Sequence, residues 1–170
     1  MADISKINHK VNISGGKSEK AGIASENQMK RAILDTLKYE KVNISCTVNI
    51  KISNDEEIRD YNRKYRDTDK PTDVLSFPMQ EFKGAGWENI DNPEPDIDTS
   101  DIPLGDIILS AETTKRQAAE YNNKAEYETA YLLIHSALHL LGYDHDSPEN
   151  EEVMHNKIKA IINETECNAK

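Results

Sequence analysis

The chain has 170 residues, of which 36% are hydrophobic and 31% charged, and its formal net charge is −10. This length suffices for a substantial core, and we expect residues 1–170 to form a single domain. The acidic balance excludes a protein that coats nucleic acid by bulk electrostatic attraction.

Localisation follows from what the sequence lacks. No apolar run approaches the ~20 residues of a membrane span, and the N-terminus has no apolar signal core. Cys46 and Cys167 lie far apart and show no CxxC spacing, which argues against a disulfide framework or a thiolate zinc site. We therefore expect a cytoplasmic protein that does not bind membranes.

The first half of the chain predicts two strands and two helices. Alternation of apolar and polar residues over 44–52 indicates a strand with one covered face. Ser25 is a suitable N-cap for the first helix, and Asn54 or Asp55 for the second. In chain order we expect a short strand at 11–13, a loop at 14–25, a helix at 26–39, the strand at 44–52 and a helix from 55 to about 65.

The second half predicts two strands, three helices and an acidic insertion. Residues 80–103 read as an irregular, solvated and flexible loop, because 81–101 contain seven acidic residues against one lysine, Lys83. A helix that begins near Ala125 carries no formal charge over 129–142, which predicts that it is buried. We expect strands at 73–77 and 104–109, and helices at 111–121, from 125 and from 148.

The stretch from Tyr131 to Asp146 carries three of the five histidines. His135 and His139 are four residues apart, which places both imidazoles on one face of a helix. Gly142 can end that helix in a left-handed turn and return His145 toward the other two. Three imidazoles without a fourth protein ligand are typical of an open zinc site. The pattern therefore predicts a metal bound by His135, His139 and His145, rather than three separate core histidines.

A basic cluster precedes the strand expected at 73–77. We interpret Arg59, Arg63 and Lys64 as a solvated helix face balanced by nearby acidic residues. Arg66 differs because it lies where the helical pattern gives way to a loop, a place where side chains are presented to sites.

Three blocks of the chain together resemble the YbeY family of bacterial endoribonucleases, also called rRNA maturation factors. They read NRKYRDTDKPTDVLSFP at 62–78, LGDIILS at 104–110 and HSALHLLGYDH at 135–145. The resemblance covers roughly residues 41–162. It implies an α+β fold in which helices surround a small mixed sheet and a buried central helix carries the three histidines.

The resemblance also implies a function and roles for particular residues. The chain would be a metal-dependent hydrolase with one zinc ion, which cleaves single-stranded RNA in 3′-end maturation of the small-subunit (16S) ribosomal RNA and in ribosome quality control. Its partners would be ribosomal RNA and the small subunit, not DNA. His135, His139 and His145 would bind the zinc, and Arg66 would act in catalysis and bind the substrate phosphate. One departure is Ser136, where the family usually has glycine.

Ser136 also separates this chain from a second class of zinc enzyme with the spacing HxxxHxxGxxH. Metzincin proteases place a glutamate directly after the first histidine, where it acts as general base. Ser136 cannot take that role at neutral pH, so the protease is the weaker alternative.

Two further alternatives stay open. In the first, the RNA 2′-hydroxyl is the nucleophile in place of water, with the metal acting only as a Lewis acid. In the second, Asp144 or Asp146 supplies a fourth ligand and closes the site. The chain would then be a non-catalytic, metal-stabilised ribosome-assembly factor.

Overall fold

The computed structural model describes residues 6–16 and 22–165. Part of the expected 14–25 loop and Cys167 therefore lie outside the described residues. The described elements form an α+β fold, as predicted. In chain order they are β1 (Lys10–Ser14), α2 (Glu26–Tyr39), β2 (Cys46–Ser53), α3 (Asp55–Arg66), β3 (Val74–Pro78), β4 (Glu81–Phe82), the 3-10 turn η2 (Trp87–Asn89), β5 (Ile90–Asp91), β6 (Ile102–Ser110), α4 (Ala111–Glu120), α5 (Ala125–Leu140) and α6 (Pro148–Ile162).

Local side-chain caps fix the starts of α2, α3, α4 and α6, whereas Lys124 at the start of α5 makes no side-chain cap. At α2, the Ser25 hydroxyl accepts from the Gln28 amide and the Gln28 side chain accepts from the Ser25 amide, a reciprocal capping box. Asn54, Ser110 and Ser147 cap α3, α4 and α6 with single side-chain acceptors. These caps explain why the helix starts were predictable from sequence.

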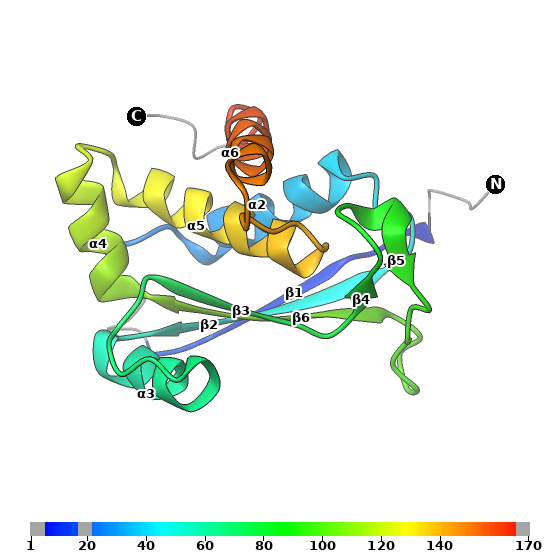
Figure 1. Cartoon of the computed structure of the whole chain (residues 1–170), viewed down its shortest axis with the longest axis horizontal. Helices are drawn as coiled ribbons and strands as arrows, with labels where there is room; N and C mark the ends of the chain where they lie inside the picture. Colours follow the sequence, from blue (N-terminus) through cyan, green and yellow to red (C-terminus); the bar gives the residue numbers. More distant parts are fainter. Residues whose placement is uncertain (1–5, 17–21, 166–170) are drawn as a thin grey trace.

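The main sheet has four strands in the order β1-β2-β6-β3. β1, β2 and β6 run parallel, and β3 is an antiparallel edge strand beside β6. Helices α2, α4, α5 and α6 lie on one side of this sheet, while α3 lies on the other and covers only part of it (Figure 1). β2 shows the predicted alternation from Cys46 onward, but Ile44 is 42% exposed and precedes the strand, contrary to our expectation.

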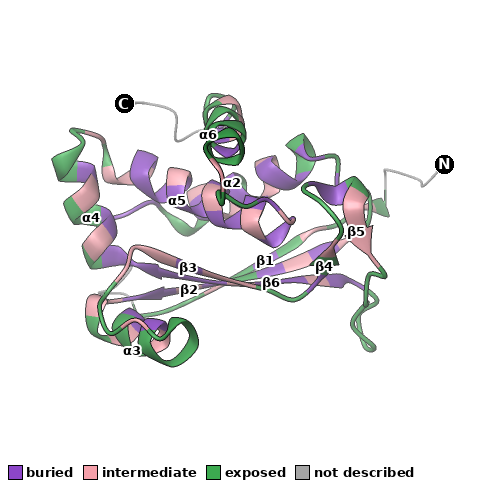
Figure 2. Ribbon diagram, viewed as in Figure 1, coloured by how far each residue is buried: buried purple, intermediate pink, exposed green. Residues whose placement is uncertain are grey.

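Helix α5 is the buried central helix and is covered along most of its length (Figure 2). Its C-terminal end packs closely on β6 at Gly105, which has a φ of +147°. A Cβ on Gly105 would lie 2.3 Å from the Phe77 carbonyl oxygen and 2.8 Å from Leu140 Cδ2. Only glycine fits between β3 and the end of α5 without displacing one of them.

The expectation of an irregular loop over 80–103 is wrong for its first half. β4 and β5 form a two-stranded hairpin, and the Trp87 ring is buried and donates to Asn43 Oδ1 at 2.7 Å. The Gly86 amide donates to the Leu141 carbonyl at 3.0 Å, which fastens the hairpin to the end of α5. Burial of one large aromatic ring outweighs the acidic composition here. The second half, 92–100, is exposed as expected.

Within residues 6–16 and 22–165, no helix has the length and apolarity needed to cross a membrane.

Candidate metal centre

Three imidazoles converge where α5 ends. His135 and His139 lie one turn apart on α5, and His145 approaches them from the following loop. One ring nitrogen from each lies within 4.8 Å of the others, and among the described residues this group contains the three histidines alone. The Nε2 atoms of His135 and His139 are 3.1 Å apart. Two nitrogens bound to one tetrahedral zinc at ~2.05 Å would be ~3.3 Å apart, so this pair fits the ion.

The predicted left-handed turn returns the chain from α5 to His145. Gly142 has a φ of +88°, and its amide donates to the His139 carbonyl at 3.1 Å. A Cβ at Gly142 would lie 2.7 Å from Phe82 Cβ, so β4 packs directly against this turn. The turn therefore depends on glycine both for its backbone angle and for the space that β4 takes.

His139 is oriented by the backbone of the same turn. Its Nδ1 lies 2.8 Å from the Tyr143 carbonyl oxygen. A carbonyl only accepts hydrogen bonds, so Nδ1 carries the proton and Nε2 presents a lone pair toward His135. A hydrogen bond of this kind fixes the tautomer that a metal-binding imidazole needs.

The protonation of these histidines also suits a cation. Burial, together with the nearby His139 and His145, lowers the pKa of His135 to about 4. Burial also lowers the pKa of His139, against the opposing hydrogen bond to the Tyr143 carbonyl. Both imidazoles are therefore neutral at pH 7, and only a neutral imidazole can bind a metal.

Arg66 lies in the same groove as the three histidines. The groove has a volume of about 940 Å³, and β3 and the end of α5 form its walls. The Arg66 Nη2 donates to the Ser76 carbonyl at 3.0 Å, which holds the guanidinium at the edge of β3. The side chain is exposed and retains donors for an anion. The structure thus brings all four predicted site residues into one cavity.

The other arginines of the basic cluster lie outside this groove. Arg59 pairs with Asp69 at 2.9 Å and Arg63 pairs with Asp60 at 2.9 Å, and all four side chains are more than half exposed. This is the solvated helix face expected from the sequence.

Several groove residues were not predicted. Phe82 and Lys83 line the groove from the β4–β5 hairpin, where we expected a loop. Tyr143 contributes a carbonyl, a group that side-chain motifs do not reveal. Its hydroxyl donates to Glu40 at 2.7 Å, and Lys157 reaches the same carboxylate at 2.8 Å. Local sequence patterns do not predict these contacts, because Glu40 lies 103 residues from Tyr143 and 117 residues from Lys157 in the chain.

Comparison with known proteins gives consistent matches over most of the chain. The family described as Endoribonuclease YbeY matches residues 13–166. A protein from Clostridium botulinum with the name Endoribonuclease YbeY is 41% identical over 154 residues, covering 86% of this chain and 92% of its own. One of the same name from Acetivibrio thermocellus is 42% identical over 134 residues, with coverages of 79% and 82%. The solution structure of a Thermotoga maritima protein matches with a TM-score of 0.54 and 26% identity, covering 92% of this chain and 91% of that one.

Proposed function

Because this chain belongs to the YbeY family of endoribonucleases, we propose that it cleaves single-stranded RNA in the groove that holds the three histidines, with one zinc ion as cofactor. The observation that carries the proposal is the convergence of three imidazole nitrogens within 4.8 Å, in a cavity that also contains Arg66. Family membership makes the chain an enzyme of the hydrolase class that acts on RNA.

His135, His139 and His145 would hold the zinc ion. When bound, the zinc supplies a Lewis acid for a phosphoryl oxygen and lowers the pKa of water. Residues of the chain orient the zinc ligands and bind the substrate. The Tyr143 carbonyl keeps His139 in its binding tautomer, and Arg66 binds the phosphate and stabilises the negative charge that develops on it. Ser136 is fully buried and cannot serve as general base.

The biological setting of the proposal follows the family resemblance. The substrate would be ribosomal RNA, with cleavage in 3′-end maturation of the 16S species and in quality control of the small subunit, in the cytoplasm. A groove of about 940 Å³ that is lined by two half-buried histidines, the exposed His145 and the exposed Arg66 accommodates a single RNA strand. The wide A-form duplex is recognised differently, mainly by its shape.

The alternative of a closed, structural zinc site needs a fourth protein ligand. Asp144 Oδ1 accepts from the His145 amide at 2.7 Å, and Asp146 Oδ1 accepts from Asn150 at 2.6 Å. Among the described residues, neither carboxylate joins the group of metal-binding atoms that lie within 4.8 Å of one another, which favours an open site and an enzyme over a non-catalytic assembly factor.

The test uses cleavage of a labelled single-stranded RNA by matched variants. His139→Ala should lose both RNA cleavage and bound zinc. Elemental mass spectrometry of the purified protein measures the zinc content. Arg66→Ala should cleave at least ~100-fold more slowly, as for loss of a transition-state donor, and keep its zinc. Arg59→Ala, on the same helix, is the control and should cleave normally. Full cleavage by His139→Ala would refute the proposal.

The chemical form of the product ends identifies the nucleophile. Product ends that carry a 2′,3′-cyclic phosphate would assign the nucleophile to the RNA 2′-hydroxyl.

A further inference from the structure

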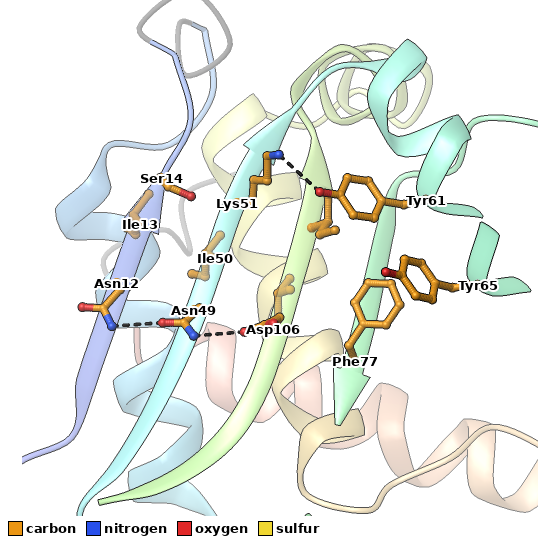
Figure 3. Close-up of a pocket in the computed structure, with 12 residues that line it drawn as sticks. Asn12, Ile13, Ser14, Asn49, Ile50, Lys51, Tyr61, Tyr65, Phe77 and Asp106 are labelled. Carbon is orange, nitrogen blue, oxygen red and sulfur yellow. Dashed lines mark hydrogen bonds between the residues drawn. The ribbon is translucent and has the colours of Figure 1, made fainter. Parts of the chain in front are cut away.

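The sheet face that α3 leaves uncovered contains a second groove, on the opposite side of the sheet from α5. Its volume is about 650 Å³. Figure 3 shows the residues that line it. We call it the open-face groove and define it by a polar row on β1, β2 and β6 and an aromatic wall on α3 and β3: Asn12, Asn49, Asp106, Tyr61, Tyr65 and Phe77.

The polar row is hydrogen-bonded in one direction across three strands. Asn12 Nδ2 donates to Asn49 Oδ1 at 3.0 Å, and Asn49 Nδ2 donates to Asp106 Oδ1 at 3.0 Å (Figure 3). These bonds fix how each amide is turned, and the row ends on a carboxylate that has a second acceptor oxygen, Oδ2. An ionised carboxylate only accepts hydrogen bonds, so the end of the row selects a ligand that donates.

The aromatic wall stands beside Asp106. Tyr61 and Tyr65 are stacked with ring centroids 6.1 Å apart, and Phe77 meets Tyr65 edge-on at 5.3 Å. Tyr65 is 53% exposed, and Lys64 Nζ lies 5.0 Å from the centroid of its ring. An exposed aromatic ring with a cation next to it and fixed amide and carboxylate groups within the groove is a typical site for an unpaired base of single-stranded RNA.

The open-face groove and the metal groove share one boundary, the edge strand β3. Consecutive residues of a strand face opposite sides of the sheet. Arg66 binds the Ser76 carbonyl in the metal groove, whereas the adjacent Tyr65 packs against the adjacent Phe77 in the open-face groove. An RNA strand that leaves the metal groove past Arg66 therefore reaches Tyr65 next. This continuity favours RNA over a protein segment as the occupant.

We propose that the open-face groove binds an unpaired base of the same RNA strand, and that it prefers a base with an exocyclic amino group. Tyr65 stacks on the base, and Asp106 accepts a hydrogen bond from the amino group, the pairing that carboxylates make with cytosine N4. Uracil has no amino group and binds less well. The inference rests on the proposed function, since it takes the RNA in the metal groove as its starting point.

The test measures binding of labelled 12-nucleotide oligo(C) and oligo(U) to metal-free protein, in which cleavage cannot interfere. Wild type should prefer oligo(C), and Tyr65→Ala should weaken oligo(C) binding ~10-fold, the effect of losing one stacked base. Tyr121→Ala removes another exposed aromatic ring, on α4, and should bind as wild type does. Asp106→Asn introduces donors and should reduce or invert the preference for oligo(C). Equal binding of oligo(C) by wild type and Tyr65→Ala would overturn the proposal.

A second measurement does not depend on any variant folding. Titration of wild type with cytidine monophosphate should shift the backbone amide resonances of Asn49 and Asp106, and shifts confined to the metal groove would refute the site. His139→Ala separates this proposal from the proposed function, because it should lose cleavage yet retain the preference for oligo(C). A wild type that binds oligo(C) selectively but cleaves no RNA would overturn the nuclease and leave the open-face groove standing.

Discussion

Replacement of Lys157 by methionine tests the buried support beneath the metal turn. Lys157 Nζ lies 2.8 Å from Glu40 Oε1, and the exposed fractions of the two side chains are 27% and 4%. Tyr143 donates to the other carboxylate oxygen at 2.7 Å. Burial lowers the pKa of Lys157, but hydrogen bonds to Glu40 and Tyr143 outweigh it and raise the pKa to about 12. The lysine is therefore charged at every pH at which the protein is studied.

The expected loss of stability follows from these contacts. Two unit charges 2.8 Å apart attract by ~6 kcal/mol at an effective dielectric of ~20. Lys157→Met removes this attraction and leaves the carboxylate of Glu40 buried, a change that typically costs 3–5 kcal/mol. Because the Tyr143 hydroxyl still donates to Glu40, we expect the lower end, a fall of ~3 kcal/mol in the free energy of unfolding. Zinc affinity should also fall ~10-fold, because Tyr143 orients His139.

Urea unfolding of metal-free protein measures the first effect, and competition with a chelator measures the second. Lys159→Met, two residues along the same helix and exposed, is the matched control and should change the free energy of unfolding by less than ~0.5 kcal/mol. The double variant Glu40→Gln/Lys157→Met should regain much of the loss, because no buried charge remains. If Lys157→Met were as stable as Lys159→Met, the reasoning about the buried pair would be refuted.

Three further predictions concern the histidine stretch. The Ser136 hydroxyl is buried without a hydrogen-bond partner, so Ser136→Ala should raise the free energy of unfolding by ~1 kcal/mol in urea titrations; a loss would contradict this. Gly142→Ala should cost ~2 kcal/mol and weaken zinc binding in chelator competition, because its Cβ would meet Phe82, and unchanged affinity would argue against this packing. Burial, with the charges of neighbouring histidines, lowers the pKa of His135 from 6.5 to about 4, so the unfolded chain takes up this proton first. As the pH falls from 6.5 to 4, the free energy of unfolding of the metal-free protein should therefore fall by up to ~3 kcal/mol relative to that of His135→Gln. Parallel pH profiles of the two proteins would exclude a lowered pKa of His135 in the folded state.

The parts of the fold that sequence reasoning predicted are those with local causes. The helix Glu26–Tyr39 begins where expected because its capping box lies within four consecutive residues. The spacing of His135 and His139 places them on one helix face whatever surrounds them, so their convergence needed no tertiary information.

The parts that were missed depend on contacts between distant residues. The Trp87 ring is buried and donates to Asn43, while the adjacent Gly86 amide donates to the Leu141 carbonyl, and an acidic composition gives no sign of these contacts. The pairing of Tyr143 with Glu40 likewise joins residues 103 positions apart. Residue patterns predict which side a segment buries, but they do not predict its partner when several surfaces are equally apolar.

Gly105 connects the two halves of the candidate metal site, although it lies in a block, residues 104–110, that supplies neither a metal-binding histidine nor a cation. The side chain of Leu140 occupies the space that a Cβ at Gly105 would take, and Leu140 directly follows His139 on α5. On the other side, the same Cβ would overlap the carbonyl of Phe77 in β3, the strand to which Arg66 is hydrogen-bonded. The absence of one side chain thus sets how closely the histidines approach the arginine. Gly105 therefore contributes to the site by packing, because it sets the distance between the helix that carries His135 and His139 and the strand that holds Arg66.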